Sequence, residues 1–346
     1  MKIKQQKPKG VWKKRMLISL LIVVGIIVSG VSYWNLSPVP KAYMYGKALT
    51  KITNTESANY ENALKKVEIV KDVDYNSKFP NGTLDIIFPK NRTEETPVIF
   101  WTHGGGFIAG DKSGLTGYAV ELAARGYTIV NINYALAPKY KYPTQINQMS
   151  EAYEYIKENK EKYKSKLDKV YFAGDSAGSF LTGQFLNIQT SPEYAKLTEI
   201  DAVVDPSTIK GALLYCGGND FVTLYNEKVK KRTEMTDFIQ TVGWSYFGKK
   251  EFGELPGAKD SSFINYVTEN YPPSFITDGN TGSFEDQNKA LVSALQSKGV
   301  TVDSLFYDKD VAGELGHEYQ LTIDSKEGQE CFEKTLEFLS KTSKTE

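Results

Sequence analysis

Apolar and polar positions follow one another along the chain in a pattern that predicts strands and helices in turn. Short runs rich in β-branched and aromatic residues indicate buried strands, and apolar positions three and four residues apart indicate helices. Strands are predicted at Val67–Val73, Thr83–Phe88, Pro97–Thr102, Thr128–Asn133, Val170–Ala173, Ile209–Cys216, Ser274–Thr277 and Thr301–Tyr307. Helices are predicted at Gly117–Arg125, Thr144–Tyr163, Ser179–Gln189, Glu285–Ser297 and Glu327–Leu339. Strands that alternate with helices favour an α/β fold, in which helices cover both faces of a mostly parallel sheet.

A different pattern occupies the N-terminus. Residues 16–34 contain no charged side chain, and this length is enough for a helix to cross a bilayer. Residues 1–15 carry seven basic side chains and no acidic one. Because such positive charge stays on the cytoplasmic side, we expect a single-pass transmembrane signal-anchor that leaves residues 35–346 outside the cytoplasm, at the cell membrane. A cleaved signal peptide, which would release a secreted protein, is the alternative.

Charge and cysteine content narrow the classes of partner and fold. The whole chain has 42 basic and 42 acidic residues, so the part after residue 15 has 35 basic residues against 42 acidic ones. An acidic globular part argues against a nucleic acid as a partner. The two cysteines, Cys216 and Cys331, are too few for a disulfide framework, and both lie in apolar patterns that predict buried free thiols.

The first candidate chemistry lies at residues 174–178, with the sequence GDSAG. The predicted strand Val170–Ala173 leads directly into it, and a helical pattern follows. A G-x-S-x-G sequence between a strand and a helix is typical of a nucleophile elbow, a sharp turn that exposes the serine, here Ser176. The glycines let strand and helix pass closely, and the helix N-terminus favours negative charge beside the serine. A glycine-rich turn with an incidental serine is the other interpretation of the pentapeptide alone.

Two further motifs precede this one. The predicted strand Pro97–Thr102 runs into the sequence HGGG at residues 103–106, where a backbone without side chains can approach a carbonyl oxygen. The predicted strand Thr128–Asn133 is followed by the sequence YALAP at residues 134–138. In this order, HGGG, Y-x-L-A-P and GDSAG resemble the hormone-sensitive-lipase-like branch of the α/β-hydrolase superfamily. The resemblance extends from about residue 67 to the end of the chain.

The resemblance implies a domain organisation. Residues 67–346 would form an α/β-hydrolase domain, and residues 220–272, a long aromatic-rich insertion between two predicted strands, would form a helical cap over the site. Insertions of that length are usually functional. Residues 35–66 begin as a proline-containing linker and would continue either as a second cap piece or as a plain spacer.

The resemblance also implies the residues of a catalytic site. Ser176 would be the nucleophile, and the backbone N–H groups of Gly105, Gly106 and Ala177 would form an oxyanion hole. Serine needs a base to take its proton, and the chain has two histidines. His103 belongs to the glycine loop, where a structural role is expected. His317 is therefore predicted as the base, since it lies in the loop after the last strand, where the order serine, acid, histidine places it.

The acid of the triad is the least determined of these residues. The family commonly carries D-P-L-x-D after the strand Ser274–Thr277, and an alignment without gaps puts its catalytic aspartate on Gly282. Asp286 matches the second aspartate of that motif and is our predicted acid. Asp278, at the end of the strand, and Glu285 are the alternatives, and each of the three carboxylates also suits a helix cap or an exposed surface.

These residues predict a carboxylesterase or lipase that hydrolyses small-molecule esters through an acyl-enzyme, with no metal or cofactor. Asp175, next to the nucleophile, is expected to brace the loop. Three alternatives stay open. One is a non-catalytic binding protein on the same fold. The others are a peptidase or amidase, which uses the same triad, and a deacetylase of envelope polysaccharides, which an outward-facing anchored domain would suit.

Overall fold

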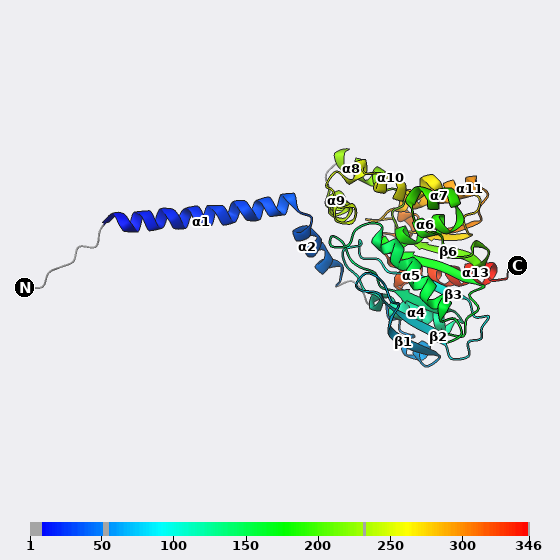
Figure 1. The fold of residues 1–346 in the computed structure, drawn as a ribbon. Coiled ribbons are helices and arrows are strands. Elements are labelled where there is room, and N and C mark those ends of the chain that lie inside the picture. Colours follow the sequence, from blue (N-terminus) through cyan, green and yellow to red (C-terminus); the bar gives the residue numbers. More distant parts are fainter. Residues whose placement is uncertain (1–8, 51–54, 231–232, 345–346) are drawn as a thin grey trace, which may run out of the picture.

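The computed structural model describes residues 9–50, 55–230 and 233–344. Its centre is an eight-stranded sheet in the order β1-β2-β4-β3-β5-β6-β7-β8 (Figure 1). The strands are β1 Val67–Asp74, β2 Thr83–Pro89, β3 Val98–Thr102, β4 Thr128–Ile132, β5 Val170–Asp175, β6 Ile209–Tyr215, β7 Ser274–Thr277 and β8 Val302–Leu305. Each lies within two residues of its predicted ends.

The sheet is parallel except at one edge. β1 pairs antiparallel with β2, and β2 pairs antiparallel with β4. All other neighbours, from β4 through β3 to β8, are parallel. The predicted mostly parallel sheet is confirmed. Because the carboxyl ends of parallel strands meet at one edge, the loops after β3, β5, β7 and β8 come together there.

Helices supply the crossovers that parallel strands need. They are α3 Tyr60–Leu64, α4 Thr116–Ala124, α5 Thr144–Glu158, α6 Ala177–Thr190, α7 Pro192–Thr198, α11 Glu285–Ser297, α12 Lys309–Ala312 and α13 Lys326–Thr342. Short 3₁₀ turns occur at Lys112–Leu115, Pro206–Thr208, Phe252–Glu254, Phe263–Tyr266 and Tyr319–Leu321. α5 ends at Glu158 and not at the predicted Tyr163. The side chain of Asn159 donates to the carbonyl oxygen of Tyr155, and the chain turns at Lys164 with φ 52°.

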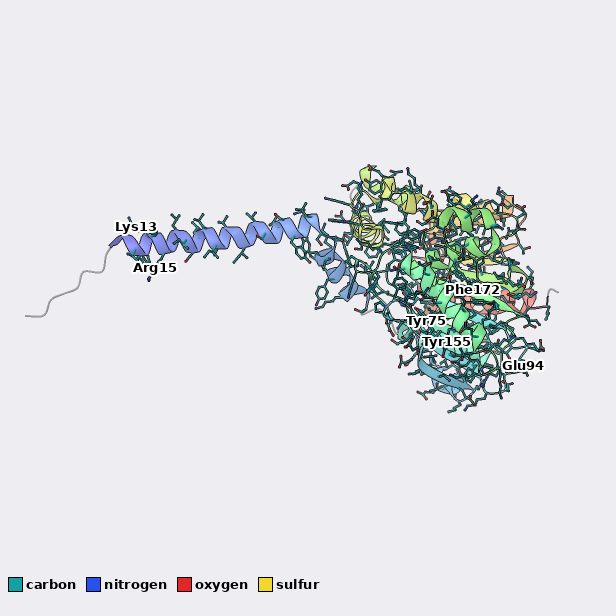
Figure 2. All side chains as sticks on the ribbon, in the orientation of Figure 1. Lys13, Arg15, Tyr75, Glu94, Tyr155 and Phe172 are labelled. Carbon is teal, nitrogen blue, oxygen red and sulfur yellow. The ribbon has the colours of Figure 1, made fainter. Side chains whose placement is uncertain are left out.

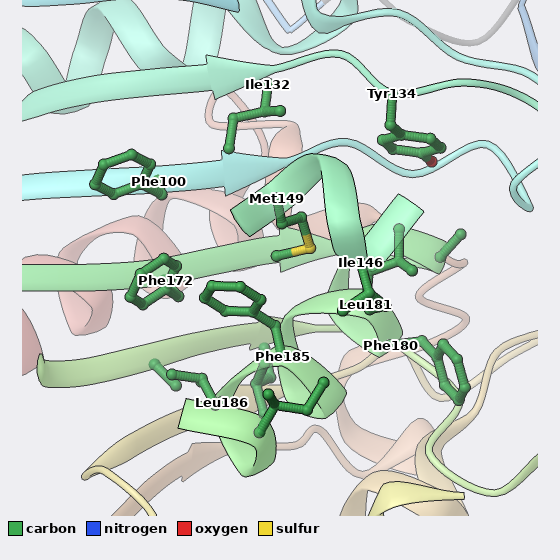
Figure 3. Close-up of a cluster of buried hydrophobic side chains, with 14 of the residues drawn as sticks. Phe100, Ile132, Tyr134, Ile146, Met149, Phe172, Phe180, Leu181, Phe185 and Leu186 are labelled. Carbon is green, nitrogen blue, oxygen red and sulfur yellow. The ribbon is translucent and has the colours of Figure 1, made fainter. Parts of the chain in front are cut away.

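Each face of the sheet has its own hydrophobic core. Successive side chains of a strand point to opposite faces. Phe100 packs with α5 and α6, whereas its neighbour Trp101 packs with α4 and α13. Figure 3 shows Phe100 and Phe172 of the sheet facing Met149 of α5 and Phe185 of α6. Burial of one such side chain stabilises the fold by about 1.5–3 kcal/mol, so both faces contribute to holding the sheet.

The N-terminal helix stands outside this body. α1 spans Lys9–Leu36, and its part Val11–Leu36 is long and apolar enough to cross a membrane, with none of its apolar stretch buried. Figure 1 shows α1 extending away from the sheet, and Figure 2 places Lys13 and Arg15 near its far end. The first eight residues of the predicted basic head lie outside the described residues.

A helical layer covers the end of the body nearest to α1. Between β6 and β7 the chain forms α8 Phe221–Lys230, α9 Glu234–Phe247 and α10 Pro256–Ser261, close to the limits predicted for the insertion. α2 Val39–Leu49 packs against α9 (Figure 1). In this contact the rings of Tyr45 and Phe238 meet edge to face, with their centroids 5.3 Å apart.

Candidate active site

Ser176 sits on a strained turn between β5 and α6, with φ 51° and ψ −119°. A left-handed backbone is costly for any residue other than glycine and persists only where its surroundings fix it. The two glycines of the motif provide that fixing. A Cβ on Gly178 would lie 1.9 Å from the carbonyl oxygen of Thr102, and one on Gly174 would lie 2.3 Å from the carbonyl carbon of Gly178. The close approach inferred from the GDSAG sequence is therefore present.

The glycine loop after β3 exposes backbone N–H groups beside the serine. Gly105 and Gly106 have φ of 101° and 59°, and a Cβ on Gly105 would lie 2.1 Å from the carbonyl oxygen of Ala109. Among the described residues, no hydrogen bond takes the N–H of Gly105 or Gly106 as donor. Ala177 is the first residue of α6, where an N–H has no partner within the helix. These are the three N–H groups predicted to receive an oxyanion.

Buried side chains hold the glycine loop in place. Asp175 accepts hydrogen bonds from the N–H of Gly104 and from Nε1 of Trp101, both at 2.8 Å. The hydroxyl of Tyr134 donates to the carbonyl oxygens of His103 and Gly104. The His103 ring stacks on Tyr134 at 4.3 Å, and burial lowers the pKa of His103 to about 4, so the ring is neutral. The structural role expected of His103 and the bracing role expected of Asp175 are confirmed.

His317 contacts the serine directly. Its Nε2 lies 2.8 Å from Oγ of Ser176, and its Nδ1 lies 2.6 Å from Oγ of Ser283. Burial lowers the pKa of His317 to about 4, so the free imidazole is neutral at pH 7. With the proton on Nδ1, the lone pair of Nε2 faces the hydroxyl whose proton a base must take.

Asp278, which directly follows β7, is the carboxylate linked to His317 through a side-chain hydroxyl. The hydroxyl of Ser283 donates to Oδ1 of Asp278, so the serine lies between the aspartate and His317. Asp278 also accepts from the N–H of Gly279, the N–H of Phe284 and Nδ2 of Asn288. Its side chain is buried, and burial raises the pKa of Asp278 to about 7 against the opposing effect of these hydrogen bonds.

The structure does not bring the predicted acid, Asp286, to the histidine. Asp286 lies in the first turn of α11 and is exposed, and none of the hydrogen bonds in the described part of the chain joins it to His317. Glu285, in the same turn, forms an ion pair with Lys289 at 2.8 Å. Of the three candidates, the geometry favours Asp278, because the loop after β7 folds back over the strand end instead of carrying the acid outward.

Comparison with known proteins places the chain in a family. Residues 84–297, from β2 to the end of α11, match the BD-FAE family model. The chain belongs to the BD-FAE family. Esterase LipC of Mycobacterium tuberculosis is 28% identical over 210 residues, which cover 58% of this chain and 48% of that protein. The acetyl esterase of Salmonella schwarzengrund is 35% identical over 86 residues, 24% of this chain and 26% of that protein. The chain thus spans less than half the length of these curated relatives.

Solved structures of the same architecture come from bacteria and archaea. Esterase B from Lactobacillus Rhamnosis superposes with a TM-score of 0.72 at 21% identity, over 89% of this chain and 95% of that one. The hyperthermophilic esterase from Pyrobaculum calidifontis gives 0.64 at 19% identity, over 92% and 98%. These likenesses show the α/β-hydrolase fold. Together with the family match, they place this BD-FAE protein on the α/β-hydrolase fold, as its motifs predicted.

Cys216 packs beside Asp278 and His317. Its Sγ, one carboxylate oxygen of Asp278 and one ring nitrogen of His317 all lie within 4.8 Å of one another. Burial raises the pKa of the Cys216 thiol well above its usual range, so the group stays protonated. A neutral thiol is a poor metal ligand and fills space beside the acid. Cys216 and Cys331 are both buried and free, as the sequence predicted.

Glu318 is a polar group of the site that sequence reasoning missed. It follows His317 with φ 64°, and its Oε1 lies 3.9 Å from Nε2 of that histidine. Burial, and then the neighbouring charge of Asp175, raise the pKa of Glu318 to about 8. Its only signal in the sequence is that it adjoins the predicted base.

Proposed function

We propose that this BD-FAE protein is a carboxylesterase-type serine hydrolase with Ser176 as nucleophile and His317 as base. The observation that carries the proposal is the 2.8 Å contact between Oγ of Ser176 and Nε2 of His317, beside the N–H groups of Gly105 and Gly106, which donate to none of the described residues. The names of the relatives support it, since LipC is named an esterase and the Salmonella protein an acetyl esterase.

The reaction follows from the contacts. His317 takes the proton of Ser176 as its hydroxyl attacks an ester carbonyl carbon, and the carbonyl oxygen becomes an oxyanion. The N–H groups of Gly105, Gly106 and Ala177 receive that charge, and loss of one such donor typically costs about 100- to 1,000-fold in rate. His317 then protonates the leaving alcohol. Water, activated by the same histidine, cleaves the acyl-enzyme.

Asp278 is the triad acid in this proposal, and Ser283 carries its effect to the histidine. A neutral imidazole that gains a proton becomes a buried cation, which a nearby carboxylate stabilises. The hydroxyl of Ser283 accepts from Nδ1 of His317 and donates to Asp278, so the negative charge acts through one polarised hydroxyl. Asp286, which we predicted for this role, is exposed and has no such contact.

The acyl group of the substrate is small in this proposal. A cavity of about 30 Å³ borders Ser176 and Ala177 and is walled by apolar side chains that include Phe180, Phe221 and Phe238. Such a volume holds two or so heavy atoms, since one water needs about 10–15 Å³ on the same measure. An acetyl group fits this space better than a fatty acyl chain.

The helical layer formed by α2, α8, α9 and α10 acts as the cap in this proposal, because Phe238 of α9 walls the acyl cavity and contacts Tyr45 of α2. α1 would anchor the enzyme in the membrane, with the hydrolase domain outside the cytoplasm. The exposed apolar surface of α1 supports either an anchor or a signal sequence. Protease added to intact spheroplasts should remove a C-terminal epitope tag and leave a short membrane-bound N-terminal fragment. A tag that stays protected would contradict this orientation.

The test of the activity uses the full chain in detergent and a series of p-nitrophenyl esters from acetate to palmitate. We expect turnover to be fastest with acetate and to be abolished by Ser176→Ala. Ser179→Ala, at a serine three residues after the nucleophile in the first turn of α6, is a matched control for folding. Folded wild-type protein without turnover on any of these esters would contradict the proposal.

A further inference from the structure

Two cavities border the catalytic centre, and they share none of their lining residues. The smaller, of about 30 Å³, is bordered by Ser176 and Gly106 and is otherwise apolar. The larger, of about 200 Å³, is bordered by Gly105, His317 and Glu318, and also by the carboxyl groups of Asp175 and Asp111. The glycine loop runs between them, so a carbonyl oxygen bound there has one cavity on each side.

The chemistry proposed above decides which part of an ester each cavity takes. The leaving oxygen receives its proton from Nε2 of His317 and must therefore lie on the side of the histidine. That side is the larger cavity. The acyl group then points into the smaller one, so the larger cavity holds the alcohol part of the substrate.

Glu318 is the carboxyl group of the larger cavity that is free to bind an alcohol beside His317. The carboxylate of Asp175 already accepts from Trp101 and Gly104. Among the described residues, no hydrogen bond reaches either carboxyl oxygen of Glu318, and its Oε1 lies 3.9 Å from Nε2 of the neutral His317. A half-buried carboxyl group that borders the cavity loses hydrogen bonds when a substrate displaces water from it, and a ligand that supplies a hydrogen bond restores them.

The position of this carboxyl group limits the alcohol further. A leaving oxygen hydrogen-bonded to Nε2 of His317 has Oε1 of Glu318 close to its neighbouring carbon, because the two protein atoms are only 3.9 Å apart. A hydroxyl on the next carbon along bridges to the carboxyl group, whereas a hydrogen atom there leaves the carboxyl group unpaired. Burial keeps Glu318 protonated at neutral pH, so the group donates and accepts but does not attract a cationic alcohol.

We propose that the larger cavity is the leaving-group subsite and that Glu318 selects alcohols with a free hydroxyl on the carbon adjacent to the ester-bearing carbon. The preferred substrates are then monoesters of 1,2-diols and polyols. This inference rests on the proposed esterase function and names the alcohol class of the same site. In it Glu318 is a specificity residue for the leaving group.

The experiment compares two acetates that differ only in hydroxyl groups, 2,3-dihydroxypropyl acetate and n-propyl acetate, on the full chain in detergent. We expect the kcat/KM of the wild type to favour the hydroxylated ester by at least about tenfold, as one hydrogen bond to a buried polar group implies. Glu318→Met removes donor and acceptor at similar length and should bring this ratio close to one. Glu318→Gln, whose amide still donates and accepts, should keep most of the preference.

Each outcome bears on one proposal. A wild-type ratio near one, or a ratio that Glu318→Met leaves unchanged, would overturn the role of Glu318, and the wild-type ratio decides even if that variant does not fold. A wild type that prefers acetylcholine to both acetates would overturn the neutral-polyol class. p-Nitrophenyl acetate separates a failure of this inference from a failure of the proposed function. Its Ser176-dependent turnover tests the esterase itself and does not involve a diol.

Discussion

The serine side and the histidine side of the catalytic centre are built in different ways. On the serine side, backbone packs on backbone, with an imagined Cβ of Gly178 only 1.9 Å from a carbonyl oxygen of β3. On the histidine side, side chains hold one another, from Asp278 through Ser283 to His317. One half of the site therefore requires positions without a side chain, and the other half requires particular side chains. The two halves should therefore fail differently when they are mutated.

The largest effect is expected from Gly178→Ala. The added methyl group would overlap the backbone of β3, which cannot move without disturbing the centre of the sheet, so we expect no folded protein. The matched change on the histidine side is Gly316→Ala, where nothing lies within 4 Å of the new Cβ. It should shift the Tm by less than about 2 °C. Thermal unfolding followed by circular dichroism checks both, and a cooperative, wild-type-like transition for Gly178→Ala would break the comparison.

The next effect separates the carboxylates of the histidine side. Asp278→Asn should lower kcat by about 100- to 10,000-fold, because the imidazolium loses the charge that stabilises it. Asp286→Asn, at an exposed position of the first turn of α11, should stay within about twofold of the wild type. Steady-state kinetics with p-nitrophenyl acetate decides between them. A large loss in Asp286→Asn with little loss in Asp278→Asn would restore the aspartate predicted from the sequence.

The same contrast explains how far the sequence could predict the molecule. Ser176 and the glycines of the oxyanion loop were predictable because close backbone approach demands glycine at fixed spacing. The central strands were predictable to within two residues because each is an apolar run, whereas the edge strands β1 and β8 mix apolar and polar residues. The acid was not predictable, because a loop held by side-chain contacts requires no particular residue at a fixed spacing in the sequence. Only the place of Asp278, directly after β7, pointed to it, and the return of the loop to Ser283 depends on hydrogen bonds that no spacing encodes.

The remaining signals were weaker still. Glu318 had no motif of its own, and its burial depends on how the loop after β8 packs against Gly104, where an imagined Cβ lies 2.9 Å from its Oε1. The end of α5 was missed because the polar residues after Glu158 suit a helix as well as a turn. In each case tertiary contacts, and not local preference, chose the conformation.

A smaller effect tests the hydroxyl between acid and base. Ser283→Ala should lower kcat by roughly 10- to 100-fold with little change in KM, because the charge of Asp278 no longer reaches Nδ1 through a bridging group. Ser283→Thr keeps the hydroxyl and should recover most of the rate. If Ser283 acts through Asp278, the double variant with Asp278→Asn should be no slower than Asp278→Asn alone. Losses that simply multiply in the double variant would show that the two residues act independently.

The smallest effect concerns a carboxyl pair that joins the two sides, Asp175 at the end of β5 and Glu318 after His317. The pKa of Glu318 is raised to about 8 in the folded protein, while in the unfolded chain it titrates near its ordinary value of 4.5. Between these values the folded state holds a proton that the unfolded state has lost. The contribution of this carboxyl group to the free energy of unfolding is therefore fully present below about pH 4.5, and it is lost as the pH rises to about 8.

Glu318→Gln removes that titration. It breaks no hydrogen bond, because the carboxyl group of Glu318 forms none with the described residues. We expect it to match the wild type in urea unfolding near pH 5 and to exceed it by roughly 1–3 kcal/mol near pH 9, where the wild type must bury a charge beside Asp175. Asp286→Asn, which changes an exposed carboxylate, is the control and should show no such widening. A gap between Glu318→Gln and wild type that stays constant with pH would mean that the carboxyl pair is solvated, and that the two halves are less closely joined at this pair than their contacts indicate.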